Sequence, residues 1–178
     1  MSQETAIAVF GGGCFWCTEA VFELVRGVGS VMPGYAGGSL PNPTYRQVCT
    51  GETGHAEVVR VEYDPATVSY RDLLTVFFAT HDPTTLNRQG ADVGTEYRSL
   101  ILYTSQAQQQ EADEFIRSLS ESSPGRPIVT ELGPLDSFYE AEDYHREYFR
   151  KNSSAPFCHF VIDPKVTKLR EKLAALLK

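Results

Sequence analysis

Residues 11–19 read Gly11-Gly12-Gly13-Cys14-Phe15-Trp16-Cys17-Thr18-Glu19, a glycine turn between two regular elements. Before the turn, residues 6–10 form a short apolar run bounded by glycines, which predicts a central strand. After the turn, apolar residues recur with helical spacing, which predicts a helix from Cys14 to about Arg26 that stops at Gly27. The stretch therefore predicts a strand, a turn and a helix, with a thiol at the turn.

The position of Cys14 suggests chemistry. A cysteine in the first turn of a helix lies near unpaired backbone N–H groups and the positive end of the helix dipole, and both favour the thiolate. Cys17 follows at i+3, on the same side of the helix and within disulfide reach. The alternative is that these cysteines are small buried hydrophobic residues. No metal site is predicted, because Cys49 and Cys158 are isolated in the sequence.

Length and charge restrict the class of protein. The chain has 178 residues, which fits a single domain spanning 1–178. Its net charge of −7 argues against a nucleic-acid or anionic membrane surface as partner. Residues 1–5 lack a basic leader, and no apolar run approaches the roughly 20 residues that span a bilayer. We therefore expect a cytoplasmic protein whose four cysteines are structural or redox-active thiols rather than a secreted disulfide scaffold.

The rest of the chain mixes strands and helices. Further strands are expected at 28–32, 57–63, 97–103 and 127–132. Further helices are expected at 70–80, capped by Ser69, and at 105–122, 138–149 and 164–178. Gly, Pro and polar residues mark 33–43 and 87–96 as functional loops. The fold class is α+β, and we expect a two-layer α/β sandwich with a mixed central sheet and a ferredoxin-like core.

Glu57 is the second candidate for chemistry. Val59, Val61 and Tyr63 alternate on one face of the predicted strand, and by parity Glu57 belongs to that apolar face. An ionised carboxylate is costly to bury, so the pKa of Glu57 should be raised. The alternative is a solvated carboxylate at the end of a strand. His145 is interpreted as a packing residue rather than a base.

Five blocks of sequence resemble one known family. In order and spacing they are similar to the motifs of the A-type peptide methionine sulfoxide reductases, and the resemblance runs from about Ala6 to Ile162. The blocks are Gly13-Cys14-Phe15-Trp16, Asn42-Pro43-Thr44-Tyr45, Gly54-His55-Ala56-Glu57, Gln89-Gly90-Ala91-Asp92-Val93-Gly94-Thr95 and Tyr97-Arg98-Ser99.

The resemblance implies roles for individual residues. By this resemblance Cys14 is the nucleophile, Glu57 is the acid, and Phe15 and Trp16 are the walls of a methyl pocket. The hydroxyls of Tyr45 and Tyr97 hold the sulfoxide oxygen, and Asp92 is the polar aspartate of the family's loop. The resemblance also implies attack of the Cys14 thiolate on the sulfoxide sulfur with proton donation by Glu57, which is reasonable for a carboxyl kept neutral by burial. The S epimer, free or in proteins, is then the substrate.

The resemblance further implies that the resulting Cys14 sulfenic acid condenses with a second thiol and that thioredoxin reduces the disulfide. No metal or organic cofactor is expected, and the protein is taken as a monomer. Many family members have Gly where this chain has Cys17, so Cys17 and Cys158 are both candidates for the resolving thiol, acting singly or as a relay. Cys49 is interpreted as structural. Glu96, commonly Gln in the family, is a second departure.

Two other classes of protein compete with this interpretation. A thioredoxin-type dithiol–disulfide oxidoreductase also has two cysteines at a helix start, and a thiol redox sensor or metal-binding module needs only reactive thiols. The thioredoxin-type class does not explain Phe15 and Trp16 between the cysteines or the block around Glu57, and neither class explains the polar loops.

Overall fold

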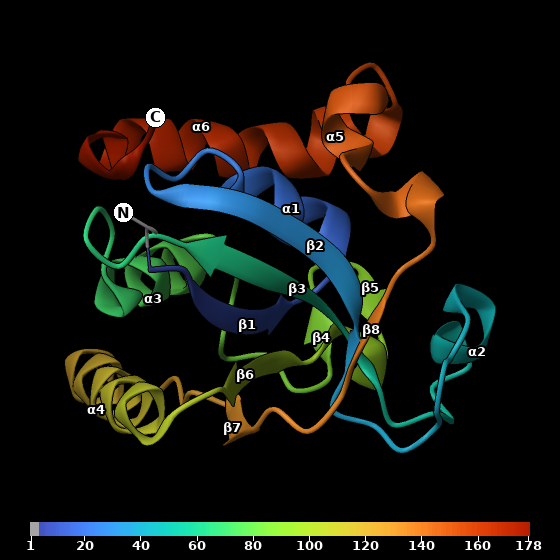
Figure 1. Ribbon diagram of the computed structural model, residues 1–178, viewed down its shortest axis with the longest axis horizontal. Helices are drawn as coiled ribbons and strands as arrows, with labels where there is room; N and C mark the ends of the chain where they lie inside the picture. The colour runs from blue at the N-terminus through green and yellow to red at the C-terminus, as the bar shows by residue number, and fades with distance from the viewer. Residues whose placement is uncertain (1–3) are drawn as a thin grey trace.

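The computed structural model describes residues 4–178, and its centre is a curled six-stranded sheet (Figure 1). The expectation that the chain lacks a leader rests partly on Met1–Gln3, which lie outside the described residues. The strand order is β7-β6-β1-β3-β2-β8, and all neighbours are antiparallel except β6 and β7. The strands are β1 (Ala6–Gly12), β2 (Val28–Ala36), β3 (Ala56–Tyr63), β6 (Ser99–Tyr103), β7 (Glu131–Pro134) and β8 (Phe138–Glu140).

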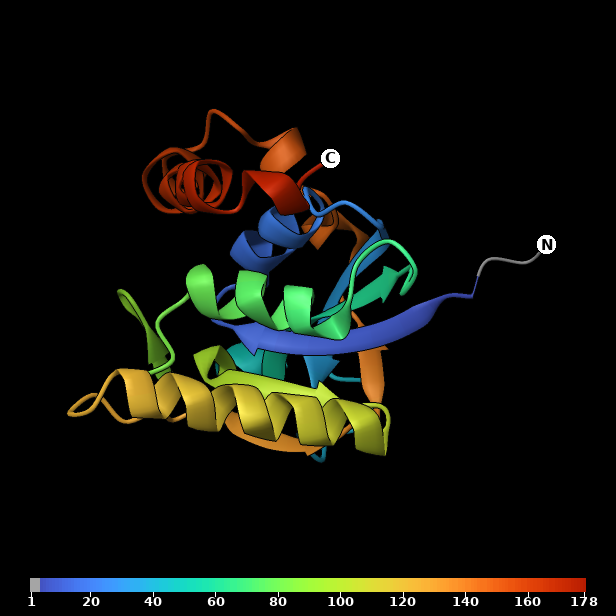
Figure 2. The ribbon, with the colours of Figure 1, turned by 90° about the vertical axis from the view of Figure 1, so that its left-hand side faces the viewer.

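Helices α1 and α3 lie against one face of this sheet, α4 packs beside α3, and α6 lies outside α1 (Figure 2). The helices are α1 (Phe15–Phe22), α2 (Tyr45–Cys49), α3 (Tyr70–Ala79), α4 (Gln106–Ser122), α5 (Tyr148–Lys151) and α6 (Asp163–Lys172). A π-helical turn, Cys158–Ile162, leads into α6, and β4 (Arg88–Gln89) forms a small hairpin with β5 (Asp92–Val93). Among residues 4–178, no helix is long and apolar enough to cross a membrane.

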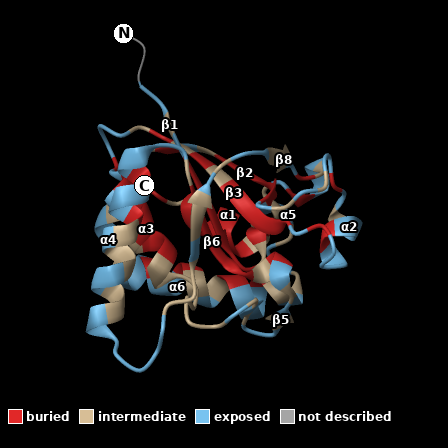
Figure 3. Ribbon diagram, turned by 90° about the horizontal axis from the view of Figure 1, so that it is seen from below, coloured by how far each residue is buried: buried red, intermediate tan, exposed pale blue. Residues whose placement is uncertain are grey.

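The core has two parts, one on each face of the sheet, and its buried residues occupy the centre of Figure 3. Under α1 and α3, the apolar face of β3 that the alternation in the sequence predicted packs with Phe10, Phe22 and Leu73. On the opposite face, Val58 and Leu100 pack under the segment that contains Phe138. Because both faces are covered, the first half of β3 is buried whichever way a side chain points, including that of Glu57.

Several expected elements are confirmed. The strand at 6–10 continues through two glycines to Gly12, and strand 57–63 corresponds to β3. Helices 70–80 and 105–122 correspond to α3 and α4, and the Ser69 hydroxyl caps α3 by accepting from the N–H of Asp72. Strand 97–103 begins two residues late, after a 3₁₀ turn at Thr95–Tyr97, and strand 127–132 lies instead at Glu131–Pro134.

The prediction of a loop beginning at residue 33 is wrong, because β2 continues through Pro33 and Gly34 to Ala36. Pro33 has no N–H, but its carbonyl still accepts a hydrogen bond from the N–H of Ala141 at 2.9 Å. Gly34 lets β8 approach closely, because a Cβ there would lie 2.4 Å from the ring of Phe138. Proline and glycine thus mark close strand packing here rather than the end of the strand.

The predicted helix at 138–149 is also wrong. Its first residues form β8, which pairs with β2, and a 3₁₀ turn (Asp143–His145) and the short α5 follow. Glu147 has a left-handed backbone with φ of 54°, which interrupts any continuous helix. Pairing with an exposed edge of the sheet therefore overrides local helical pattern.

Two predicted helices are shorter than expected for one shared reason. The helix expected to reach Arg26 ends at Phe22, and the one expected to reach Lys178 ends at Lys172. Beyond these ends the two segments bond to each other: the N–H of Arg26 donates to Leu176 at 2.7 Å, and that of Lys178 donates to Leu24 at 2.9 Å. The C-terminal segment is thereby tied to the end of α1.

Candidate active site

Cys14 lies at the point where β1 ends and α1 begins. Gly13 makes the turn with φ of +95°, and Cys14 is the N-cap residue, whose carbonyl accepts from the N–H of Cys17 at 3.1 Å. A side chain at Gly13 has no room, because its Cβ would lie 2.6 Å from Cγ of Gln89. The strand, the turn and the helix thus place the Cys14 thiol as the sequence predicted.

The protonation of the two thiols differs from the expectation. Burial, a hydrogen bond to Cys17 and the nearby Glu57 carboxyl raise the pKa of Cys14 well above its ordinary value. The hydrogen bond from Cys14 lowers the pKa of Cys17, against the opposing effect of burial. The prediction of a depressed pKa at Cys14 is therefore wrong, because apolar burial outweighs the dipole of an eight-residue helix.

Cys158 lies in the same apolar cluster as Cys14 and Cys17. Cys17 and Cys158 are buried, all three are free thiols, and Ile162 and Val166 complete the cluster around them. Burial raises the pKa of Cys158, and the charges of Asp163 and Cys17 add to this. The structure thus places both candidate resolving thiols in one cluster with the predicted nucleophile.

Cys49 is not a core residue, which corrects its interpretation as structural. It ends α2 and is exposed. Its thiol forms a hydrogen bond with the side chain of Tyr45, while burial of the thiol raises its pKa.

Glu57 is 1% exposed, and its alternative interpretation as a solvated carboxylate is wrong. Oε1 accepts from the N–H of Phe15 at 3.1 Å, whereas buried Oε2 has no hydrogen-bond partner among residues 4–178. Burial raises the pKa of Glu57 to about 8, partly offset by the bond from Phe15 and reinforced by the charges of Asp92 and Glu96. The predicted rise is confirmed, and the carboxyl is mostly protonated at pH 7.

Tyr45, Tyr97 and Asp92 surround this carboxyl, and all three are half-buried. Burial, followed by the charge of Glu57, raises the pKa of both tyrosines, so each hydroxyl keeps its proton at neutral pH. Burial also raises the pKa of Asp92, while the charge of Lys165 opposes the rise. The predicted acid therefore lies beside two hydroxyl donors and a second carboxyl.

Phe15 and Trp16 form an aromatic group with His145. Phe15 is fully buried, and the indole Nε1 of Trp16 donates to Nδ1 of His145 at 3.0 Å. Because Nδ1 accepts, the proton of the neutral ring is on Nε2, which is buried without a partner in the described chain. Burial lowers the pKa of His145, and Tyr148 stacks on Trp16 with ring centroids 3.7 Å apart. The interpretation of His145 as a packing residue agrees with this buried position.

Sequence reasoning missed Tyr35 and Glu142. The Tyr35 hydroxyl donates to Oε1 of Glu142 at 2.8 Å, and the N–H of Tyr45 donates to Oε2 at 3.0 Å. Burial acts to raise the pKa of Glu142, but the bonds from Tyr45 and Tyr35 bring it below its ordinary value. Glu142 therefore orients Tyr45, and no periodicity could reveal this because Glu142 lies within the segment 138–149 that was wrongly predicted as helix.

Glu19 is a second buried carboxyl that the sequence did not single out. It is 1% exposed, and its two oxygens accept from the N–H groups of Glu147 at 3.0 Å and Tyr148 at 3.3 Å. Burial raises its pKa to about 7, which the same two bonds oppose. Glu19 therefore connects α1 to the segment that precedes Cys158.

No group of three or more His, Cys, Asp or Glu within residues 4–178 could hold a metal ion. The reactive groups that the structure does gather are thiols, a protonated carboxyl and phenolic hydroxyls. These are nucleophiles and proton donors in an apolar surrounding. Fold and site together define a thiol-dependent oxidoreductase.

Comparison with known proteins identifies the family. A model described as peptide methionine sulfoxide reductase matches residues 6–176. The peptide methionine sulfoxide reductase MsrA of Sulfolobus acidocaldarius is 59% identical over 162 residues, 91% of this chain and 92% of that protein. The MsrA of Deinococcus radiodurans is 59% identical over 171 residues, 96% of this chain and 82% of its own. The chain belongs to the peptide methionine sulfoxide reductase family, and its A-type resemblance is confirmed.

Solved structures agree with this assignment. Reduced Mxr1 of Saccharomyces cerevisiae has a TM-score of 0.79 at 34% identity, covering 87% of this chain and 90% of that one. Methionine sulfoxide reductase A of Corynebacterium diphtheriae has a TM-score of 0.78 at 38% identity, covering 86% and 78%. Mxr1 in complex with Trx2 shares the fold with a TM-score of 0.56 at 23% identity, covering 83% and 89%.

Proposed function

We propose that the chain reduces methionine S-sulfoxide with Cys14 as nucleophile and Glu57 as proton donor. The observation that carries this proposal is the buried Glu57 carboxyl, whose pKa of about 8 keeps its proton available at neutral pH. A sulfoxide oxygen is a poor leaving group until it is protonated, so a neutral carboxyl close to the nucleophile supplies what the reaction lacks.

The reaction begins with a proton shift. The Cys17 thiolate, whose pKa the hydrogen bond from Cys14 lowers, accepts the Cys14 proton and leaves Cys14 as a thiolate in an apolar surrounding. The Cys14 sulfur then attacks the sulfoxide sulfur while Glu57 gives its proton to the oxygen. This attack forms a bond between the two sulfur atoms. The hydroxyl then transfers from the sulfoxide sulfur to the Cys14 sulfur as the sulfur–sulfur bond and the sulfoxide sulfur–oxygen bond break, so methionine leaves and Cys14 becomes a sulfenic acid.

The other site residues bind the substrate. Trp16 supplies apolar surface for the methyl group of the sulfoxide, and the fully buried Phe15 completes the wall of this methyl site from within. Tyr45 and Tyr97 donate hydrogen bonds to the oxygen as negative charge develops on it, and their high pKa values keep them protonated. Asp92 lies on the neighbouring loop and helps to keep Glu57 neutral through its charge.

Resolution proceeds through Cys17 and then Cys158. The Cys17 sulfur attacks the sulfenic acid of Cys14, water leaves, and a Cys14–Cys17 disulfide forms. Cys158 then exchanges with this disulfide to form a Cys17–Cys158 bond, and a thioredoxin dithiol reduces it. The shared apolar cluster of the three thiols supports this order. The structure of Mxr1 in complex with Trx2 motivates thioredoxin as the reductant.

The remaining expectations concern the whole protein. The antiparallel order β6-β1-β3-β2, with α1 and α3 as connections on one face, supports a ferredoxin-like two-layer core extended by β7 and β8. We further propose a single domain, 1–178, that acts as a monomer in the cytoplasm, where thiols stay reduced. No cofactor takes part in the proposed reaction.

The two epimers of a blocked methionine sulfoxide test the proposal, with dithiothreitol as reductant. We expect turnover of the S epimer alone and none in Cys14→Ser. Turnover of neither epimer, together with reduction of insulin disulfides, would instead identify a thioredoxin-type dithiol oxidoreductase. Oxidation of the thiols without turnover of either substrate would identify a redox sensor.

A further inference from the structure

A groove on the surface of the described chain is not used by the proposed mechanism. It encloses about 550 Å³ between the ends of α3 and α4, the loop after α3, and the start of α6. Phe78, Leu119 and Ile128 supply apolar surface, and Arg126, Lys165 and Lys168 supply positive charge. We refer to these six residues as the cationic groove.

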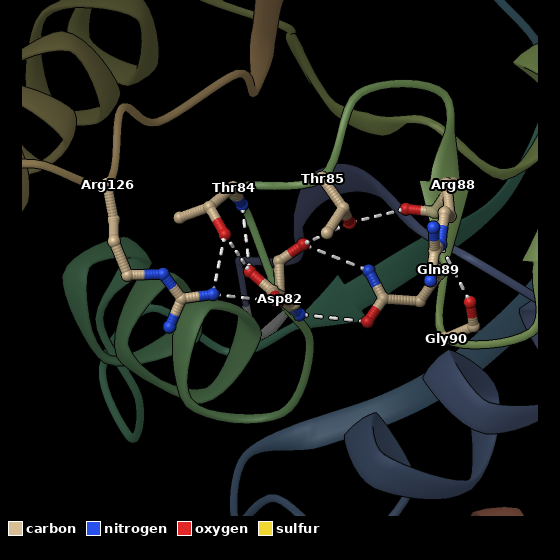
Figure 4. A network of polar contacts seen from close by, with 7 residues as sticks. All are labelled: Asp82, Thr84, Thr85, Arg88, Gln89, Gly90 and Arg126. Atoms are coloured by element: carbon tan, nitrogen blue, oxygen red, sulfur yellow. Dashed lines mark hydrogen bonds and ion pairs between the residues drawn. The ribbon is translucent and has the colours of Figure 1, made fainter.

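A network of hydrogen bonds holds one side of the groove in shape (Figure 4). The side-chain amide of Gln89 accepts from the N–H of Asp82 at 2.9 Å and donates to its carbonyl at 3.0 Å. The N–H of Thr84 donates to Oδ1 of Asp82 at 2.9 Å, and Arg126 donates to Thr84 at 3.1 Å and to Asp82 at 3.4 Å. Hydrogen bonds therefore hold the side of the groove that contains Asp82 and Arg126.

The groove adjoins the thiol site at two points. Gln89 borders the groove and also packs on Gly13, the turn residue before Cys14. Lys165 borders both the groove and a small internal cavity shared with Cys17, and its charge lowers the pKa of Cys17. A chain lying in the groove thus passes beside the residues that react.

The charge of the groove is opposite to that of the whole protein. The net charge of the chain is −7, yet three cations face this cavity and Asp82 is its one carboxylate. Arg126 already pairs with Asp82, while Lys165 and Lys168 form no ion pair with any carboxylate of residues 4–178. Burial lowers the pKa of His81 to about 4, so this bordering ring is neutral. Two cations therefore remain for a ligand.

We propose that the cationic groove binds the polypeptide that flanks an oxidised methionine, and that it favours segments in which apolar residues accompany Asp or Glu. The apolar surface and the two available cations match such a segment, and the groove leads to the thiol site. The inference rests on the proposed reductase activity and adds to it a preference for acidic protein substrates over free methionine sulfoxide.

The test compares two peptides of equal length that carry the S-sulfoxide between apolar residues, one with flanking Glu and one with flanking Lys. Dithiothreitol serves as reductant, and the blocked amino acid is the third substrate. We expect the wild-type chain to favour the acidic peptide in kcat/KM by roughly two- to fivefold at low salt, as for an exposed ion pair. The preference should decrease at high ionic strength.

Lys168→Glu should remove or reverse this preference while turnover of the blocked amino acid stays unchanged. Lys172→Glu is the matched control, because Lys172 is an exposed lysine of the same helix that does not border the groove, so it should keep the preference. Equal turnover of both peptides by the wild-type chain, or equal losses in the two variants, would overturn the proposal. Failure to turn over the blocked amino acid would instead refute the reductase activity.

One further outcome would assign the groove to another occupant. If Lys168→Glu leaves all dithiothreitol-dependent rates unchanged but slows recycling by thioredoxin, the groove binds the reductant rather than the substrate chain. This result would overturn the proposal.

Discussion

The N–H of Phe15 donates to Oε1 of Glu57 at 3.1 Å, and this bond joins the first residue of α1 to strand β3. Cys14 immediately precedes that N–H, so the proposed acid is held at a fixed position beside the proposed nucleophile. The same carboxyl has a second oxygen without a partner among the described residues. One oxygen is thus used for position, and in the proposed mechanism the other oxygen gives its proton to the sulfoxide.

Replacing the acid tests its role directly. Glu57→Gln keeps an oxygen that can accept from Phe15 but removes the proton donor, so we expect kcat/KM for the blocked S-sulfoxide to fall by about 10²- to 10⁴-fold. Glu52→Gln, an exposed change on the preceding turn, is the control. Steady-state kinetics with dithiothreitol measures both variants, and a loss of less than about threefold in Glu57→Gln would contradict general acid catalysis.

The pH dependence should show the same group. Glu57 has a pKa of about 8, so its protonated fraction falls as the pH rises through that value. We therefore expect kcat/KM of the wild-type chain to decrease above about pH 8 and Glu57→Gln to lack this decrease. A profile of kcat/KM from pH 6 to 10 for both proteins measures this decrease. The same decrease in both proteins would assign it to another group.

Glu57→Gln should change stability in the opposite sense to activity. The folded-state pKa of Glu57 is raised from 4.5 to about 8, so this group stabilises the fold most fully below pH 4.5, and its contribution is lost as the pH rises through 8. Glu57→Gln removes this dependence. At pH 8 to 9 we expect its free energy of unfolding to exceed that of the wild type by on the order of a few kcal/mol. Urea unfolding at pH 5 and pH 9 tests this, and an equal difference at both pH values would refute it.

The hydrogen bond between Trp16 and His145 can be measured by a double-mutant cycle. Removing either partner leaves a buried polar group unpaired, so Trp16→Phe and His145→Phe should each destabilise the fold by about 1 to 3 kcal/mol. The double variant should lose little more stability than either single variant. Urea unfolding of the four proteins gives the coupling energy. Strict additivity would show that the 3.0 Å contact contributes no net stability.

The thiol relay predicts different effects for each cysteine. Cys158→Ser should keep its turnover rate with dithiothreitol, whereas its turnover rate with thioredoxin should fall by on the order of tenfold. The Cys14–Cys17 disulfide should then accumulate. Cys17→Ser should instead retain the sulfenic acid of Cys14 longer, which trapping with a sulfenic-acid reagent and mass spectrometry detects. Cys49→Ser serves as control. A Cys14–Cys158 disulfide in the wild-type chain under single turnover would show that Cys17 is bypassed.

The sequence was sufficient for features that depend on neighbours along the chain. The glycine turn predicted the position of Cys14, and the alternation in strand 57–63 predicted that Glu57 is buried. Features that depend on distant segments were out of reach. The raised pKa of Cys14 arises from packing against β3 and the C-terminal segment. Tyr35 forms its hydrogen bond with Glu142, which lies 107 positions away in the sequence. Local pattern carries no record of such contacts.

The π-helical turn Cys158–Ile162 begins at the last thiol of the chain. A π turn holds one residue more than an α turn, so rewinding it would slip the register by one residue and rotate Cys158 by about 100° about the helix axis. Val166 and Leu169 would keep α6 in place, because their packing lies beyond the turn. The sulfur could then exchange a partner inside the protein for one in solvent at the cost of a local rewinding, without the undocking of a helix.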